Sequence, residues 1–488
     1  MGAAMTDTTD KAIFLDEAST QTNLLARFSQ YMVRFAERWF PDAYVFVLIA
    51  VVVIALCTIV HGGSPLAVSR AFGDGFWNLI PFTMQLALAA VGGYVVAMSP
   101  PVAALMRRLA GMPSTARGAV VFVGVLSILL SLLNWSLSLI FSGLLVREIA
   151  RRKDIKLDYR AAGAAGYLGL GCGFTLGITS SVAQLQANAG SIPASLLPIT
   201  GVISFSETIL TWQNLVTILA VTALSATICY LTTPNEALTR TAEDLGVSLD
   251  DDLIAPKKPT RPGDFLEFSP VLTILIVALA SGWLWQTFQS GNPLITLSGL
   301  NTYNFVFLVL GILLHWRPRS LLDAFSKGTP SISGLLLQFP FYAGIAHMLT
   351  KVPNSSGLTL SDTVAHWFAN VSVNSTVFSF LIGIYSAVLG FFIPSAGGKW
   401  IIEAPYIMKA ANEIGAHLGW TTMVYNIAET LPNFINPFWM LPLLGVLGLK
   451  SKDLIGYTSV QFFVHFPIVM ILAAILMTTF TYHAPILP

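Results

Sequence analysis

Charged residues are scarce in this chain of 488 residues, since only 10% are Asp, Glu, Lys or Arg while 55% are hydrophobic. An ordinary soluble domain carries about 25% charged residues, and a chain this apolar would expose large apolar patches in water. The scarcity excludes a soluble domain and predicts an all-α polytopic membrane protein in a lipid bilayer. The net charge of +1 also argues against a nucleic-acid partner, which requires a basic face.

Cysteine and the common catalytic motifs are scarce as well. The three cysteines are widely spaced, which gives neither a disulfide framework nor a metal-binding knuckle. The chain has no HExxH, no GxSxG and no close pair of histidines, and its one glycine-rich run, at 169–173, lies within an apolar segment with no strand before it. We therefore expect no enzyme, no metal and no cofactor.

Long apolar runs are abundant instead. A membrane helix needs about 20 predominantly apolar residues. Uninterrupted candidates are Asp42–His61, Trp77–Met98, Trp212–Thr232, Pro270–Trp285, Tyr303–Trp316, Ser331–Leu349 and Tyr457–Phe480. Two further runs, 161–188 and 419–449, are rich in Gly, Ser, Thr, Asn and Pro and are predicted to be broken helices. The total is about nine transmembrane helices.

Two segments have the length of hairpins. No charge lies between Arg117 and Arg147, and one straight helix over this segment would be about 43 Å long. That is too long for a hydrocarbon core of about 30 Å and too short for two crossings. Because Leu133–Ser138 forms a polar break at its midpoint, 117–147 is predicted to be a re-entrant hairpin. The segment 374–410, with a break at 394–398, is predicted to be a second one.

The basic residues orient this topology. With the N-terminus in the cytoplasm, every basic residue except Arg70, Lys351, Lys399 and Lys409 falls on the cytoplasmic side, as the positive-inside rule requires. The C-terminus is then periplasmic. Similar residues recur at an offset of 253, as in Gln85 and Gln338, and an extra helix between the halves predicts two inverted repeats. The predicted parts are an N-terminal cytoplasmic segment (1–42), a first repeat (43–234), a cytoplasmic linker (235–265), a linking helix (266–300) and a second repeat (301–488).

The four breaks are the predicted site. Irregular backbone at membrane depth survives only where protein or a water-filled cavity covers it, and each break exposes a helix N-terminus that favours an anion. We therefore expect a small carboxylate to bind there, although Gly, Ser and Thr in membrane helices often serve only close packing and Trp135 could belong to the core. The candidate substrate-binding residues are Asn134, Trp135, Ser136, Ser138, Thr179, Ser180, Ser181, Pro394, Ser395, Gly397, Gly398, Lys399, Asn433 and Asn436.

Three ionisable residues lie near these breaks, where such residues are functional candidates. Lys399 and Glu403 have the spacing of a helical ion pair, so they could neutralise each other, or Lys399 could hold the substrate. Glu429 has no partner nearby in the sequence. Glu429 and Glu403 are therefore the candidate sites for a coupling ion, H⁺ or Na⁺.

Three stretches carry a resemblance to a known family: GFFIPSAGGKWIIEAPYIMKAA at 390–411, NIAETLPNFINPFWMLPLLG at 426–445 and SLLNWSLSLIFSGLLVREIARR at 131–152. They resemble the AtoE family of short-chain fatty acid transporters. The resemblance implies uptake of butyrate, acetoacetate and similar monocarboxylates across the bacterial inner membrane, with protons as the expected coupling ion. It also implies homodimers, an elevator-type movement, hairpin tips at Ser136, Ser138, Ser395 and Gly397, and Thr179, Ser180, Asn433 and Asn436 opposite them.

Other functions remain open. A dicarboxylate carrier would need a second positive or hydrogen-bonding cluster, and a cation/proton antiporter would need an acidic pair at the broken helices, where only Glu429 is available. A membrane-embedded enzyme lacks a catalytic motif. A passive channel usually shows one repeated pore unit per subunit, whereas this chain has two halves.

Overall fold

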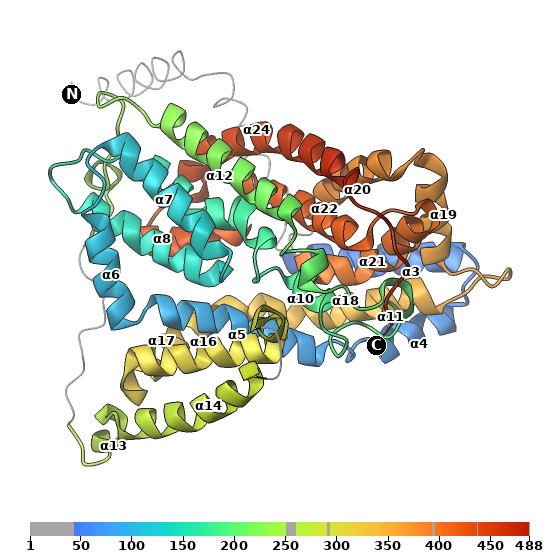
Figure 1. Cartoon of the computed structure of the whole chain (residues 1–488), viewed down its shortest axis with the longest axis horizontal. Coiled ribbons are helices and arrows are strands. Elements are labelled where there is room, and N and C mark those ends of the chain that lie inside the picture. Colours follow the sequence, from blue (N-terminus) through green and yellow to red (C-terminus); the bar gives the residue numbers. More distant parts are fainter. Residues whose placement is uncertain (1–42, 250–259, 290–292, 393–395, 437, 488) are drawn as a thin grey trace, which may run out of the picture.

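The computed structural model describes residues 43–249, 260–289, 293–392, 396–436 and 438–487, and this part of the chain is helical. Most of its helices lie side by side along one direction, which is horizontal in Figure 1. The predicted segment 1–42 and residues 250–259 of the predicted linker lie outside the described residues.

The helices fall into two consecutive series. The first consists of α3 (Ala43–Val60), α4 (Pro65–Gly75), α5 (Ile80–Ala97), α6 (Pro100–Ala110), α7 (Ala116–Ser131), α8 (Trp135–Ala150), α9 (Tyr159–Gly166), α10 (Ser181–Gln186), α11 (Leu197–Thr200) and α12 (Trp212–Thr232). The linking elements are α13 (Asp264–Phe268), α14 (Val271–Gln289) and α15 (Pro293–Ser298). The second series consists of α16 (Leu300–His315), α17 (Pro318–Gly328), α18 (Ser333–Lys351), α19 (Leu360–Val371), α20 (Ser375–Phe392), α21 (Ala396–Ile414), α22 (Leu418–Thr430), α23 (Leu441–Leu447) and α24 (Ser451–Met477).

Two helices of the first series have counterparts in the second. Both α4 and α17 have 11 residues, and they begin 253 positions apart, as do α5 and α18. Their contacts are reciprocal, since α18 packs against α3 and α4 while α5 packs against α16 and α17. Exchange of this kind is what a two-fold relation between the halves would produce. The inverted sense of the repeats remains a prediction.

Each predicted hairpin is a pair of helices. The first turns at Leu132–Asn134, and the side chain of Asn134 caps α8 by accepting a hydrogen bond from Leu137 N (2.9 Å). Its arms α7 and α8 pack along each other. In the second hairpin, α20 ends at Phe392 and α21 begins at Ala396. The predicted break residues Pro394 and Ser395 lie outside the described residues.

The two predicted broken spans are also interrupted. After α9 the first span passes through a π-helical turn (Gly169–Gly173) and a 3₁₀ turn (Phe174–Leu176), and α10 begins at Ser181. The second passes from α22 into a 3₁₀ turn (Leu431–Phe434) before α23. Glycine is required in the first turn, because a Cβ at Gly171 would lie 2.1 Å from the Phe434 ring. The two broken spans therefore contact each other directly at Gly171 and Phe434.

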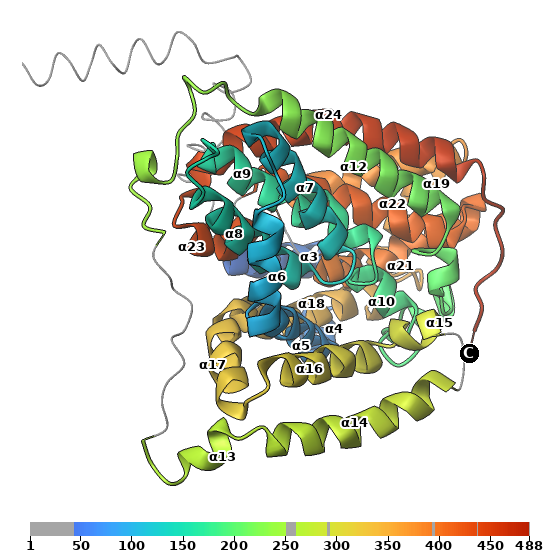
Figure 2. The ribbon, with the colours of Figure 1, turned by 60° about the vertical axis from the view of Figure 1, so that its left-hand side comes forward.

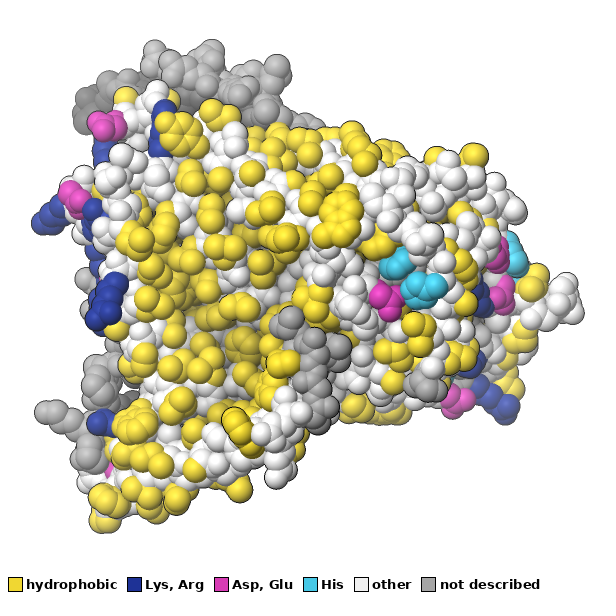
Figure 3. Space-filling view, in the orientation of Figure 1, with side chains coloured by type: hydrophobic (Ala, Val, Ile, Leu, Met, Phe, Trp, Pro, Cys, Tyr) yellow, Lys and Arg dark blue, Asp and Glu magenta, His cyan; other side chains and the backbone are white. Residues whose placement is uncertain are grey.

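The outer surface matches a membrane protein. Five helical segments of the described chain are long and apolar enough to cross a membrane, and α17 with α18 meets the same criterion as a pair bent by 56°. The predicted number of nine spans remains a prediction. A broad apolar band covers the face in Figure 3, charged side chains gather at its two ends, and His is seen toward the right end. Figure 2 shows α14 at the edge of the molecule alongside α16.

Candidate functional site

All four breaks contribute to one pocket. About 540 Å³ of space not filled by atoms, including the part open to the surroundings, lies among its lining residues. Its described lining residues are Leu86, Trp135, Leu170, Phe174, Thr179, Ser181, Leu335, Phe339, Ala396, Gly397, Glu429, Asn433 and Trp439. Trp135 and Ala396 are the first residues of α8 and α21, so the N-terminal ends of both hairpin helices face the pocket.

The tip of the first hairpin is held by a tyrosine from the other half of the chain. The Tyr303 hydroxyl on α16 donates to Leu133 O (2.6 Å) and accepts from Asn134 Nδ2 (3.0 Å). Asn134 also donates to Ala89 O on α5 (3.0 Å). The side-chain oxygen of Asn134 also caps α8. Asn134 therefore holds the tip of the hairpin in place without lining the pocket.

Thr179 and two tryptophans form one wall. The Thr179 hydroxyl oxygen accepts the backbone N–H of Trp135 (3.2 Å), which joins the first broken span to the first hairpin. The Trp135 ring meets the Trp439 ring edge to face, with centroids 5.5 Å apart. This part of the pocket therefore combines a polar contact, made by Thr179, with the apolar rings of Trp135 and Trp439.

Ser181, Gly397 and Asn433 also line the pocket. Gly397 lies so close to Ser181 that a Cβ at position 397 would be 3.2 Å from the serine oxygen. The Asn433 Oδ1 is buried and has no hydrogen-bond partner within the described chain. An unpaired acceptor beside a pocket is available to a hydrogen-bond donor of a ligand.

A buried ion pair between Lys399 and Glu403 follows Gly397 on α21. The Lys399 ammonium donates to Ser386 O (2.9 Å) and Ser386 Oγ (3.0 Å), and it lies 3.6 Å from Glu403 Oε2. The same carboxylate oxygen accepts from the Tyr425 hydroxyl at 2.6 Å. The geometry matches the expected helical pair, and neither charged residue lines the pocket.

Glu429 differs from this pair. It is 1% exposed, it lines the pocket, and its Oε2 has no hydrogen-bond partner among the described residues. An isolated ionised carboxylate in such a place is costly unless it is paired or protonated. Glu429 is therefore suited to hold a proton or a cation next to whatever fills the pocket.

The structure separates the predicted residues into lining and supporting groups. Trp135, Thr179, Ser181, Gly397, Asn433 and Glu429 line the pocket. The supporting group lies around it without lining it: Asn134, Ser136, Ser138, Ser180, Gly398, Lys399, Glu403 and Asn436. In this group Ser138 donates to Ser127 O (2.7 Å), Asn426 donates to Ser180 Oγ (2.6 Å) and Asn436 donates to Phe391 O (2.8 Å).

Sequence reasoning missed the apolar lining and Tyr303. Leu86, Phe339 and Leu335 come from α5 and α18, the two corresponding long helices. The repeated Gln85 and Gln338 next to them were the available signal. Tyr303 gave no such signal, since a tyrosine in an apolar run is typical of a membrane span.

The pocket has the chemistry of a site for a small amphipathic anion. Helix N-termini and the Ser181, Thr179 and Asn433 side chains supply polar contacts, while Leu, Phe and Trp side chains cover the rest. Among the lining residues that the structure describes, none is basic and Glu429 is the one acid. A ligand with one carboxylate and a short apolar part fits this distribution.

Two solved structures have a similar fold. The YdaH transporter of Alcanivorax borkumensis aligns over 90% of this chain and 97% of its own, with a TM-score of 0.57 and 18% identity. MtrF of Neisseria gonorrhoeae, described as an antimetabolite efflux pump, aligns over 93% of this chain and 100% of its own, with a TM-score of 0.53 and 14% identity. At these identities the likeness concerns the fold alone.

Sequence comparison is more specific. The profile described as "Short chain fatty acid transporter" matches residues 24–477. A protein of Escherichia coli (strain K12), provisionally named a short-chain fatty acid transporter, is 32% identical over 89% of this chain and 96% of its own length. A protein of Haemophilus influenzae with the same name is 31% identical over 92% and 99%. The resemblance is thereby confirmed, and the chain, a multi-pass membrane transporter and not an enzyme, belongs to the short-chain fatty acid transporter family.

Proposed function

We propose that this protein imports short-chain monocarboxylates, such as butyrate and acetoacetate, across the bacterial inner membrane together with protons. In this proposal the N-terminus is cytoplasmic, the C-terminus is periplasmic, and the protein works as a homodimer by an elevator-type movement. Family membership supports the substrate class. The observation that carries the proposal is the convergence of four chain breaks on one pocket whose described lining has no basic residue and a single acid.

The substrate would bind by its two chemically different ends. Its carboxylate would accept hydrogen bonds from the polar residues at the helix N-termini, which favour a negative charge without fixing it as tightly as a lysine would. The alkyl chain would lie against Trp135, Trp439 and Phe339. A site without a full counter-charge also releases its ligand readily, as a carrier must.

Charge balance supports the proton as the coupling ion. Lys399 and Glu403 form one buried ion pair, so a charged Glu429 leaves one negative charge beside an anionic substrate. A proton on Glu429 would remove that charge and supply a donor to the substrate carboxylate.

The lining argues against the two alternatives. A dicarboxylate would place a second negative charge in a pocket whose described lining contains no basic side chain. A cation/proton antiporter of the same architecture would need a second acid at the breaks, whereas Glu403 is engaged by Lys399 and Tyr425.

The test is uptake of radiolabelled butyrate into proteoliposomes that contain the purified protein. A proton gradient, acidic outside, and a sodium gradient are imposed in separate runs, and protein-free liposomes with the same gradients correct for diffusion of the neutral acid. Accumulation driven by the proton gradient alone is the expected result. Accumulation that requires sodium would remove the coupling assignment, and no protein-dependent uptake under either gradient would remove the substrate class.

A further inference from the structure

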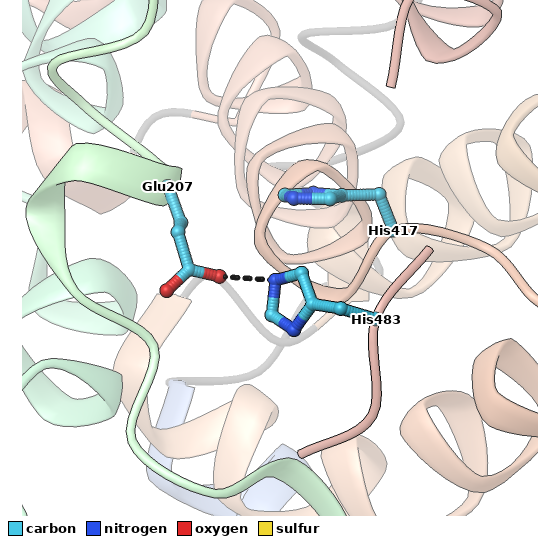
Figure 4. Close-up of side chains that lie close together, drawn as sticks. All are labelled: Glu207, His417 and His483. Atoms are coloured by element: carbon cyan, nitrogen blue, oxygen red, sulfur yellow. Dashed lines mark hydrogen bonds and ion pairs between the residues drawn. The ribbon is translucent and has the colours of Figure 1, made fainter. Parts of the chain in front are cut away.

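A second group of functional side chains lies away from the pocket, near the end of the chain. Glu207 from the turn before α12, His417 from the start of α22 and His483 from the C-terminal tail come together in Figure 4. Their potential ligand atoms all lie within 4.8 Å of one another. In the part of the chain that the structure describes, this is the one group of three or more His, Cys, Asp or Glu side chains with such spacing.

His483 presents a ring nitrogen to Glu207. Its Nδ1 lies 3.0 Å from Ala484 O, and its Nε2 lies 2.8 Å from Glu207 Oε2. Both neighbours are acceptors, so a neutral imidazole with one proton satisfies only one of them. At 2.8 Å a proton joins Nε2 to the carboxylate, and a metal ion bound by both groups would replace this proton and move them slightly apart. A backbone carbonyl on the remote nitrogen is also the usual support for a metal-binding histidine.

His417 is the third ligand and lies in a protected place. It is 7% exposed, and its ring stacks on Phe480 with centroids 4.5 Å apart. Gly419 allows the Glu207 segment to approach, because a Cβ there would lie 2.3 Å from Glu207 O.

We propose that Glu207, His417 and His483 bind one divalent transition-metal ion of the zinc type. Two histidines and one carboxylate with a water in the fourth position are a common zinc coordination. The sites of Mg²⁺ and Ca²⁺ are instead built from oxygen ligands. The site is separate from the transport pocket, since none of the three residues lines it.

One existing hydrogen bond opposes metal binding and sets its strength. His417 Nδ1 accepts the backbone N–H of Trp420 at 3.0 Å and so caps α22. A metal on either ring nitrogen removes this cap, because Nδ1 is then either metal-bound or protonated. Loss of a helix cap changes an equilibrium constant by about tenfold, so the site should bind more weakly than a preformed zinc site of the same ligands.

The metal would hold the C-terminal tail against the segment before α12 and the start of α22. The tail already contacts neighbouring segments, since Val202 donates to Ile486 O (2.8 Å) and Tyr482 donates to Asn412 Oδ1 (3.1 Å). Asn412 lies on α21, which begins at the transport pocket. Bound metal therefore stabilises the end of the molecule at which α21 ends and α22 begins.

The experiment measures thermal unfolding of the full chain in detergent after chelator treatment, with ZnCl₂ or MgCl₂ added back. Zinc at about 100 times its Kd should raise the Tm by about 3–5 °C, and metal analysis after desalting should give one zinc per chain. Magnesium should have no effect. A zinc content of more than one per chain in the metal analysis would contradict a defined site.

Variants distinguish an effect of bound zinc on the Tm from an effect of the existing hydrogen bonds. Glu207→Gln and His483→Gln remove ligands, and His417→Asn removes a ligand while keeping a side chain that can cap α22. Each should abolish the zinc-dependent rise. The matched control is His366→Gln, since His366 pairs with Glu413 (3.1 Å) elsewhere on the surface, and it should leave the rise unchanged.

Two results would overturn the proposal. An equal zinc effect in His417→Asn and the unmodified protein would exclude His417 as a ligand. No zinc effect in the unmodified protein, together with a loss of stability in His483→Gln without metal, would show that a protonated His483 forms only an ion pair with Glu207. Neither result depends on the transport function, because the readout is stability and metal content.

Discussion

Glu429 is the residue on which the coupling assignment depends. The buried carboxyl lines the pocket and its Oε2 has no described partner, whereas Glu403 is shared by Lys399 and Tyr425. Glu429→Gln keeps the size of the side chain and supplies an N–H donor in place of the carboxyl O–H, but it cannot release a proton. Proton-driven butyrate accumulation should fall at least tenfold, while exchange of internal for external butyrate should continue.

Both assays can be run on the same proteoliposomes, with Glu413→Gln as the control for an exposed carboxylate. Accumulation in Glu429→Gln with an unchanged dependence on external pH would show that another group carries the proton.

Tyr303 tests the support of the pocket at the residue scale. In Tyr303→Phe, Leu133 O and Asn134 Nδ2 each lose a hydrogen-bond partner, and a lost hydrogen bond costs about 0.5–1.5 kcal/mol. Because the tip of the first hairpin then moves more freely, the KM for butyrate should rise several-fold with a smaller change in maximal rate.

The matched control is Tyr159→Phe, which removes a comparable buried hydrogen bond to Leu447 O (3.0 Å) without altering a pocket contact. Equal KM values in the two variants would mean that the hydroxyl of Tyr303 serves stability alone.

Individual roles were only partly predictable from the sequence. Asn134 and Ser138 belong to the predicted polar break, and both side chains were expected to bind substrate. In the structure their polar atoms bond to Ser127, Ala89 and Tyr303. These partners lie on other helices, so nothing in the local sequence distinguishes a supporting amide from one that faces a ligand.

Elements were more predictable than residues. The first hairpin turns within the predicted break because Asn134 caps α8 at the place where the charge-free segment becomes polar. The sequences 161–188 and 419–449 likewise contain the observed interruptions. The participation of α5 and α18 in the pocket was missed, because an apolar side chain that faces a pocket and one that faces lipid have the same hydropathy. The repeated Gln85 and Gln338 beside the lining residues were the available signal.

The contact between the broken spans can be tested by a single methyl group. A Cβ at Gly171 would lie 2.1 Å from the ring of Phe434, which is fully buried. Such overpacking costs about 1–3 kcal/mol, so Gly171→Ala should lower the Tm and reduce butyrate uptake. The double variant Gly171→Ala/Phe434→Leu should recover part of both.

Gly282→Ala is the control, because nothing lies within 4 Å of its added Cβ. A Gly171→Ala protein as stable and active as the unmodified one would mean that the two spans do not meet as closely as described.

At the scale of the whole molecule, composition and spacing were sufficient to predict a helical membrane protein. The offset of 253 recurs in the starts of α4 and α17 and of α5 and α18, and α18 packs against α4 while α5 packs against α17. The cluster of Glu207, His417 and His483 was not predictable, since these residues are far apart in the sequence and only the folded tail unites them.

The central claim is that the four breaks form one carboxylate site, and site-directed labelling tests it most directly. Ser181 lines the pocket, so Ser181→Cys, with the native cysteines replaced by serine, is treated with a small thiol reagent in membranes with and without butyrate. Ser355→Cys, in an exposed loop, is the control. Butyrate should slow labelling at position 181 and leave position 355 unchanged, whereas equal labelling rates at position 181 with and without butyrate would contradict the account.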